Sequence, residues 1–426
     1  MKQDLKDNLR KLNRRYAKVI VVTLRILLGA TFIFSGFVKG IDLWGFIFKM
    51  EEYLSVMDIV LPRSVSLTLC MTVATVEFLC GLLLLLGSYR RVVPVIMGLM
   101  MAVMLPLSGW LFFASPIEDC GCFGDAVALS NGATFFKNIL ITGGVAYLIK
   151  YNKYVRRKVY HDELQWLVWM GGLVYMTFLS LTCYNVQPMI DFRPFPEGSK
   201  ILRETTDDDA EVTFIYTNGS VTQEFTADNL PQDSSWTFVE RKDGTGKANT
   251  AELAIFDGDE EVAEDVIANE GQQMLFVVPE MNRVDLSYTY FVNELYRLCN
   301  ENGIDFIALL AADHEGIEWW KDYSMANYEC FSAEDTQLKS LVRGKMSLVY
   351  LEDGIIKWKR TISSLVERGD WQEGQYGADF PNHMVTDLSS RFWRLTSWFL
   401  GWLVFVGLIE AVLRFILSKK EINKKS

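Results

Sequence analysis

Long apolar stretches stand near both ends of the chain. Five of them lie at about residues 17–37, 64–86, 92–114, 133–151 and 164–184, and a sixth covers about 392–417. A helix needs about 20 mostly apolar residues to cross a bilayer. The pattern therefore predicts a membrane bundle of five helices over residues 1–185. It also predicts a C-terminal transmembrane helix with a basic tail over residues 391–426.

Basic residues cluster beside alternate ends of these stretches. The clusters lie in the N-terminal tail, at Arg90 and Arg91, around residues 150–158, and in the C-terminal tail. If the helices alternate in direction, all four clusters fall on one side, and clustered Lys and Arg mark the cytoplasmic side. We therefore expect a multi-pass protein of the bacterial inner membrane, with both termini cytoplasmic and residues 186–390 extracytoplasmic.

The segment between the fifth and sixth apolar stretches has strand patterns. Residues 186–271 are expected to be β-rich, because residues 212–216 and 221–225 flank an Asn-Gly turn that suits a type I′ hairpin. Residues 272–390 then change to strand–helix–strand order, which resembles the thioredoxin fold. The expected fold class is an α-helical membrane bundle plus an α/β extracytoplasmic domain, thioredoxin-like with a β-rich lead-in.

This second domain lacks the chemistry that thioredoxins carry. Its residues 279–285 stand where thioredoxins place Cys-x-x-Cys, and they contain no cysteine. We expect Cys299 and Cys330 to be core packing, as buried cysteines usually are. The thioredoxin-like domain is therefore interpreted as redox-inactive, retained to bind a partner or to cover the membrane site.

Charge divides the chain in the same way. Residues 191–390 contain 39 Asp and Glu against 16 Lys and Arg, a net charge of −23, whereas the rest has 14 acidic and 26 basic residues, a net charge of +12. An acidic domain joined to a basic membrane part excludes a nucleic-acid binder. An envelope protein docking on the outer domain is expected to present a basic or neutral surface. Ordinary solvation of a surface domain is the alternative explanation.

The third and fourth apolar stretches are joined by a turn with two cysteines. Cys120 and Cys122 are the candidate catalytic residues, and the turn that supports them consists of Asp119, Gly121, Phe123, Gly124 and Asp125. A disulfide within Cys-x-Cys is strained, and strained disulfides are reactive oxidants. The two flanking aspartates oppose thiolate formation. A redox pair, a structural disulfide and a soft-metal site all stay open, although two thiolates alone underfill a zinc site, so no metal is expected.

Two charged residues lie inside the first two apolar stretches. Arg25 and Glu77 stand at similar depth when counted from the inner ends of their helices, and charges at such depth normally pair or line a cavity. We expect them to pair, either as a structural clasp or as a site for proton movement or a quinone headgroup. Glu410 and Arg414, four residues apart, are expected to form a same-face pair.

Several short strings carry a family resemblance. They are Arg25-Ile-Leu-Leu-Gly29, Phe34-Ser-Gly36 and Lys39-Gly40, then Glu77 with Gly81 and Gly87, then Cys-Gly-Cys-Phe-Gly. On these strings, residues 17–150 resemble the DoxX/MauE family. The resemblance implies a four-helix bundle, distantly like vitamin K epoxide reductase homologues. It also implies thiol or sulfur oxidation with quinone, or disulfide formation in a partner enzyme, with Cys120 and Cys122 in that role. The loop 38–63 lacks the cysteine pair that those homologues carry there.

Two functions from different classes follow. The first is an integral membrane, quinone-linked thiol–disulfide oxidoreductase of the cell envelope that acts through Cys120 and Cys122. The second is a non-catalytic membrane scaffold or assembly factor whose redox-inactive thioredoxin-like domain docks an envelope partner. A transporter is disfavoured, because the sequence shows no interrupted helix pair or internal repeat.

Overall fold

The fold consists of two compact units. The computed structural model describes residues 2–114, 121–127, 129–155, 162–202, 213–217, 222–226, 237–242, 253–366 and 380–423. One unit contains residues Met1–Arg193 and Arg360–Ser426, and the other contains Pro194–Lys359. Each unit is therefore described separately below.

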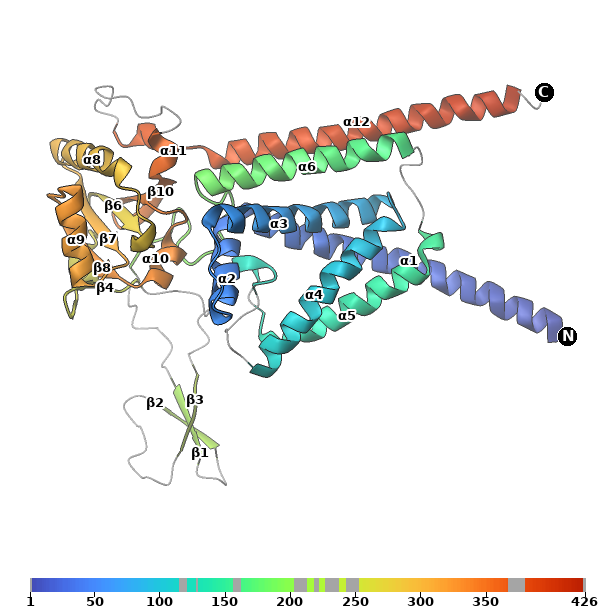
Figure 1. Ribbon diagram of the computed structural model, residues 1–426, viewed down its shortest axis with the longest axis horizontal. Coiled ribbons are helices and arrows are strands. Elements are labelled where there is room, and N and C mark those ends of the chain that lie inside the picture. Colours follow the sequence, from blue (N-terminus) through green and yellow to red (C-terminus); the bar gives the residue numbers. More distant parts are fainter. Residues whose placement is uncertain are drawn as a thin grey trace. The chain divides into compact units, whose positions relative to one another are not determined.

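The first unit is helical (Figure 1). Its helices are α1 (Lys2–Ile41), α2 (Leu43–Val56), α3 (Arg63–Leu86), α4 (Val92–Ala114), α5 (Asn131–Lys150), α6 (Asp162–Asn185), the short α11 (Ile362–Val366) and α12 (Leu388–Asn423). Among the described residues, six helices are long and apolar enough to span a membrane: α1, α3, α4, α5, α6 and α12. The expected helical membrane bundle is confirmed.

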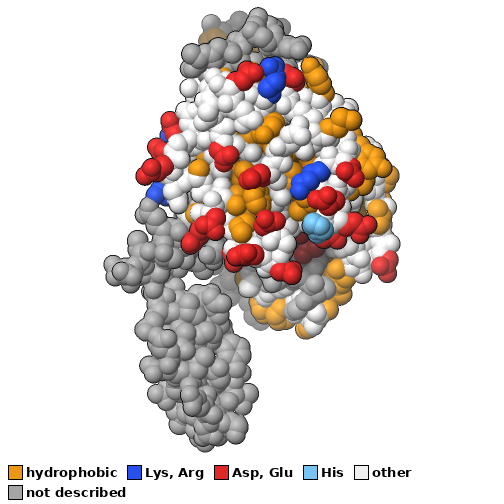
Figure 2. Space-filling view, turned by 90° about the vertical axis from the view of Figure 1, so that its left-hand side faces the viewer, with side chains coloured by type: hydrophobic (Ala, Val, Ile, Leu, Met, Phe, Trp, Pro, Cys, Tyr) orange, Lys and Arg blue, Asp and Glu red, His pale blue; other side chains and the backbone are white. Residues whose placement is uncertain are grey.

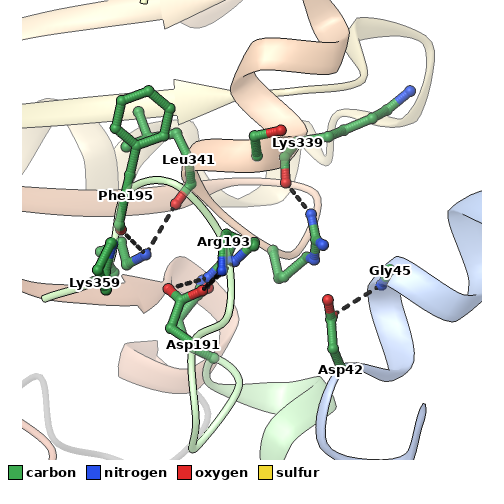
Figure 3. Close-up of polar contacts among 12 residues, drawn as sticks. Asp42, Gly45, Asp191, Arg193, Phe195, Lys339, Leu341 and Lys359 are labelled. Carbon is green, nitrogen blue, oxygen red and sulfur yellow. Dashed lines mark hydrogen bonds and ion pairs between the residues drawn. The ribbon is translucent and has the colours of Figure 1, made fainter. Parts of the chain in front are cut away.

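Local capping sets several helix ends in this unit. Asp42 ends α1 and starts α2, because its carboxylate accepts a hydrogen bond of 2.9 Å from the Gly45 amide, as Figure 3 shows. At the far end of α3, Gly87 adopts φ +70, the left-handed conformation that suits a glycine C-cap. Ser130 caps α5 by accepting from the Ala133 amide.

Helices α6 and α12 pack closely along their length. The rings of Tyr175 and Phe399 stack with centroids 4.5 Å apart, and the Trp402 indole donates to the Leu167 carbonyl at 3.0 Å. Gly171 makes room for this tryptophan, since a Cβ there would lie 2.3 Å from the Trp402 ring. The expected Glu410–Arg414 pair is confirmed at 2.7 Å.

The second unit is built on strands. These are β1 (Thr213–Thr217), β2 (Thr222–Thr226), β3 (Thr237–Lys242), β4 (Ile255–Asp257), β5 (Glu260–Glu261), β6 (Gln272–Val278), β7 (Asp305–Leu310), β8 (Glu329–Ala333), β9 (Ser347–Glu352) and β10 (Ile355–Thr361), the last of which ends just inside the first unit. Strands β1–β3 form a three-stranded antiparallel sheet of order β2-β1-β3. The expected hairpin is thus confirmed, with Thr217 opposite Thr222.

The other strands form a mixed seven-stranded sheet of order β10-β9-β6-β7-β8-β4-β5. Strands β6, β7 and β8 are parallel, and β9 pairs antiparallel with β6. Helices α8 (Thr289–Glu301), α9 (His314–Ser324) and α10 (Asp335–Leu341) connect these strands, and the four-residue α7 (Ala263–Val266) precedes β6. Because β6 is central, six of its seven residues are buried, as a near-continuous apolar strand should be.

The expected α/β domain is confirmed, while its likeness to thioredoxin stays a prediction. Strand β4 belongs to the large sheet, paired antiparallel with β8, although it lies in the segment that we expected to be a β-rich lead-in. At the other end of this unit, the Lys359 ammonium donates to the carbonyls of Phe195 at 2.7 Å and Leu341 at 3.1 Å (Figure 3). These bonds tie the first and last residues of the unit together.

Candidate functional site

A buried ion pair joins the first two membrane helices. The Lys39 ammonium on α1 lies 2.8 Å from both carboxylate oxygens of Glu77 on α3. Lys39 is 3% exposed and Glu77 5%. Two charges that are taken out of water this completely are stable only when paired. The pair is therefore a fixed local charge arrangement inside the bundle.

Glycines bring α1 and α3 close enough for this pairing. A Cβ at Gly36 would lie 2.4 Å from the backbone nitrogen of Phe78, and one at Gly81 would lie 2.5 Å from the backbone nitrogen of Ile33. Both distances are shorter than any real contact, so the two backbones touch where neither has a side chain. This crossing sets Lys39 level with Glu77.

Ser35 connects the ion pair to the cysteine turn. Its hydroxyl lies 2.8 Å from Glu77 Oε2, 3.0 Å from the backbone carbonyl of Cys122, and 3.2 Å from the Lys39 ammonium. A serine hydroxyl has one proton to donate, so it donates to the carboxylate or to the carbonyl, while Lys39 donates to it. The turn is thus held against the pair through a single hydroxyl that can change its acceptor.

The turn itself is tight and glycine-dependent. Gly121 has φ +60 and Gly124 has φ +53, both in the left-handed region. Phe123 packs on Phe34 with ring centroids 5.6 Å apart, and the Lys137 ammonium lies 4.2 Å from the Phe123 ring centroid. These contacts fix the turn between α1 and α5.

Not every residue of the predicted turn can be placed. Cys122 is partly buried, and Asp125 lies in the short 3₁₀ helix Gly124–Ala126. Cys120 and Asp119 lie outside the described residues. The catalytic role of Cys120 and Cys122 therefore stays a prediction.

A cavity of about 40 Å³ lies beside the pair and the turn. Ser35, Lys39, Glu77 and Cys122 line it, together with residues from α4 and α5. Figure 1 shows the α4–α5 hairpin diverging from α1 and α3 towards its tip. The cavity is thus bounded by both helix pairs and by the cysteine turn.

One side chain of the cavity wall has an unused hydrogen-bonding group. Asn138 on α5 is 4% exposed, and its amide nitrogen has no hydrogen-bond partner among the described residues. Burying such a group without a partner costs free energy, so the amide is a binding group for whatever enters the cavity.

Arg25 does not occupy the position that we expected. We expected it to pair with Glu77, whose partner in the structure is Lys39. Arg25 instead donates to the backbone carbonyls of Leu84, at 2.7 Å, and Leu85, near the end of α3. The depth count failed because Arg25 lies level with the last turn of α3, about two helical turns beyond Glu77.

Sequence reasoning missed three residues of this site. Lys39 was noted only as part of a family string, and Ser35 and Asn138 were not singled out. The sequence did contain an indication for Lys39 and Ser35. They are four positions apart and so share a helix face, and Gly36 marks the adjoining face of α1 that contacts α3. Nothing comparable in the sequence marks Asn138.

The sheet unit contains no exposed thiol among its described residues. Cys299 and Cys330 are buried, which confirms the expected core packing. Burial raises the pKa of the Cys299 thiol above its usual range and that of Cys330 to about 12. Neither thiol is therefore poised for redox chemistry.

The surface of this unit is acidic with aromatic patches. Figure 2 shows a face on which Asp and Glu outnumber Lys and Arg, with apolar side chains between them. Helix α9 exposes Trp319 and Tyr323, whose rings stack with centroids 4.9 Å apart, alongside Glu315 and Asp322. Exposed paired aromatics in such a setting are typical of interaction surfaces.

The chain matches one protein-family model in each of its two units. Residues 17–150 match the family model described as methylamine utilisation protein MauE. This part of the chain is similar to the MauE family. Residues 17–150 include most of α1 and all of α2 to α5, together with the Lys39–Glu77 pair and the cysteine turn. Residues 210–245, which include β1–β3, match a domain family of unknown function, DUF8463. No curated protein matches the chain.

Proposed function

We propose that this multi-pass membrane protein is a thiol–disulfide oxidoreductase of the cell envelope that uses Cys120 and Cys122 and passes electrons to a quinone. The observation that carries the proposal is the Ser35 link. It joins the backbone of Cys122 to the buried Lys39–Glu77 pair, so a cysteine turn lies against groups that can hold protons and charge. A purely structural turn needs no such charged support.

The proposed chemistry is thiol–disulfide exchange. A substrate thiolate attacks one sulfur of the Cys120–Cys122 disulfide, which forms a mixed disulfide and releases the other cysteine as a thiolate. The second substrate thiol then displaces the attached cysteine. The substrate leaves as a disulfide, and Cys120 and Cys122 hold its two electrons as a dithiol.

Lys39, Glu77 and Ser35 serve this chemistry through charge and proton transfer. The ammonium of Lys39 lines the same cavity as Cys122, and a nearby cation favours the thiolate form of a cysteine. Glu77 accepts one proton at a time as the dithiol is reoxidised, and Ser35 positions the turn beside that carboxylate through its contacts with Glu77 and the Cys122 backbone carbonyl. The pair stays overall neutral before the reaction, which is why it is tolerated inside the bundle.

The cavity suits one end of a quinone. Its wall combines the unpartnered Asn138 amide with apolar side chains, and quinones present a carbonyl oxygen on a flat apolar ring. When bound, the quinone accepts two electrons and two protons. The chain's own residues bind it, exclude water and hold the protons.

The proposed orientation places this chemistry outside the cytoplasm. The basic clusters of the sequence assign both termini to the cytoplasmic side, and six alternating spans then leave the cysteine turn and residues 186–390 on the other side. Disulfides are permitted there and rare in the cytoplasm.

A second candidate function is a membrane scaffold that docks an envelope protein. The exposed Trp319–Tyr323 stack, set among acidic side chains, favours it. The lack of an exposed thiol among the described residues of the sheet unit also fits a docking role.

The proposal is tested with full-length protein in liposomes that contain a short-chain benzoquinone. A dithiol peptide is the electron donor, and disulfide and quinol are measured in parallel. We expect them to form in equal amounts, and we expect Cys122→Ser to abolish both. Cys299→Ser, which changes a buried cysteine of the sheet unit, is the control and should keep activity. Full activity in the Cys120→Ser/Cys122→Ser double variant would contradict the proposal.

A further inference from the structure

A larger cavity lies in the membrane unit between α12, α6 and the end of α3. Its volume is about 470 Å³, which is within the roughly 300–1,000 Å³ of small-molecule sites. Leu86 on α3 and Val168 on α6 line it, together with one face of α12 from Leu403 to Arg414. Helix α12 extends past the first turn of α6 (Figure 1). None of the residues of the proposed thiol chemistry lines this cavity.

The cavity follows α12 over the depth of one lipid leaflet. The helix rises about 16 Å between Leu403 and Arg414. Half of the hydrocarbon core of a bilayer is about 15 Å thick. Gly407 lies near the middle of this run, and a Cβ there would meet no described atom within 4 Å. The length and the open middle of the cavity suit one extended acyl chain.

The charged residues of the lining lie towards one end of the cavity. The Arg414 guanidinium donates from Nε to the Glu410 carboxylate at 2.7 Å, and the side chains are 45% and 4% exposed. A guanidinium has five N–H donors in a planar fork, and it binds phosphate as well as carboxylate. Arg414 can therefore hold Glu410 inside the cavity while its exposed part meets a phosphate at the membrane surface.

The sequence beyond Arg414 adds positive charge at the same end. Four lysines and one glutamate lie between residues 419 and 425, and Arg90 and Arg91 follow Leu86 in the turn after α3. Clustered Lys and Arg mark the cytoplasmic end of a membrane helix. Such clusters immediately cytoplasmic of a membrane helix are typical of sites for anionic lipid headgroups. The charge pattern therefore favours an anionic lipid over a neutral one.

We propose that this cavity binds an anionic phospholipid of the inner leaflet, with one acyl chain along α12 and the phosphate at Arg414. Arg414 is the binding residue, and Glu410 positions its guanidinium. The bound lipid fills the space between α12 and the ends of α3 and α6, so it should stabilise the membrane unit. Lipid binding at this position needs neither the cysteine pair nor a quinone, so it is independent of the proposed thiol chemistry.

The test compares two lipids that differ only in headgroup. Purified full-length protein in detergent is titrated with phosphatidylglycerol or with phosphatidylcholine of the same acyl chains, and the rise in melting temperature gives each affinity. We expect phosphatidylglycerol to bind more tightly. Glycerol phosphate at the same concentration should give no rise, because it lacks the chain that fills the cavity. Equal affinities for the two lipids, or a full rise with glycerol phosphate, would overturn the proposal.

Charge variants then locate the phosphate. Arg414→Gln should weaken phosphatidylglycerol binding about fivefold, as expected for one basic residue at an anionic surface, and leave phosphatidylcholine unchanged. Glu410→Gln should keep or raise the affinity, since it removes a negative charge beside the phosphate. Arg394→Gln, which changes an exposed arginine near the other end of α12, is the matched control and should bind as wild type does. Unchanged phosphatidylglycerol affinity in Arg414→Gln would contradict the assignment.

A double variant guards against misfolding of the single one. Glu410→Gln/Arg414→Gln leaves no buried charge unpaired, so it measures the loss of the guanidinium in a neutral cavity. It should show the same reduced preference for phosphatidylglycerol. A double variant that keeps the wild-type preference would place the phosphate elsewhere.

Filling the cavity tests where the acyl chain lies. Gly407→Leu should weaken the binding of both lipids and, without lipid, melt no lower than wild type, because leucine favours helix over glycine. Gly401→Leu is the matched control, since a Cβ there also meets nothing within 4 Å but the residue does not line the cavity. Equal lipid binding in both variants would exclude this cavity. A wild-type dimer in lipid-free detergent that Gly407→Leu dissociates would show instead that a second copy of the chain occupies it.

Discussion

Lys39 on α1 and Glu77 on α3 form a buried ion pair at 2.8 Å, and Ser35 joins that pair to the backbone of Cys122. The pairing depends on the glycine crossing of the two helices, which removes every side chain that would hold them apart. Fold and proposed chemistry therefore share one structural feature, the α1–α3 contact.

Removing one partner of this pair should destabilise the membrane unit strongly. Lys39→Met leaves Glu77 buried without its cation, and the free energy of unfolding should fall by about 3–5 kcal/mol. Glu77→Leu should cost a similar amount. The double variant should recover much of the loss, since no charge is then left unpaired. Thermal melting of the four proteins in one detergent gives the coupling, and purely additive losses would contradict a direct pair.

The glycines at the crossing should not tolerate a methyl group. Gly36→Ala and Gly81→Ala each force α1 and α3 apart and should cost about 1–3 kcal/mol of stability. Gly143→Ala is the matched control, because a Cβ at that helix position meets nothing within 4 Å. It should be neutral or slightly stabilising, since alanine favours helix over glycine. Equal melting temperatures for all three variants would rule out the close crossing.

The two cysteines of the sheet unit should resist alkylation in the folded protein. Alkylation requires the thiolate, and the pKa of Cys330 at about 12 leaves almost none at pH 8. Cys299 has its pKa raised further by burial. Mass spectrometry after iodoacetamide treatment should show both unmodified until denaturant is added. Rapid labelling of either residue in native protein would show that the sheet opens.

Asp285 should make a small pH-dependent contribution to stability. Its carboxylate accepts hydrogen bonds from the Ser287 hydroxyl at 2.7 Å and the Ser287 amide at 3.1 Å, which lower its pKa. A lowered pKa stabilises the fold above the unfolded value, about 3.9, and that stability is lost as pH falls through the folded value. Asp285→Asn should therefore melt below wild type at pH 7, and the gap should close in strong acid. A gap that is constant with pH would exclude this carboxylate as the cause.

Local features of the sequence predicted most of the fold. The membrane helices follow from apolar runs of sufficient length, and the Asn-Gly sequence between two strand patterns predicted the β1–β2 hairpin, because both depend on neighbouring residues only. The sequence alone could not assign β4 to the large sheet. Its partner β8 lies more than 70 residues away, and three residues carry too little pattern to specify a pairing.

The site was predicted less completely, because it depends on contacts between helices that are distant in the sequence. Glu77 was correctly expected to have a partner, but which cation reaches it depends on the crossing at Gly36 and Gly81 and not on depth counted from helix ends. Asn138 was missed because no sequence pattern shows whether a buried amide is satisfied. That property appears only when the helices around it are in place.

The redox state of Cys120 and Cys122 in intact cells tests the central claim most directly. Free thiols are trapped with a mass-tagged alkylating agent in cells with normal quinone and in cells depleted of it, with Cys122→Ser as the reference for the tagged species. We predict a pair that is mainly oxidised with quinone and becomes reduced when quinone is depleted. A pair that stays fully oxidised in both conditions would contradict electron flow to quinone and leave a structural disulfide.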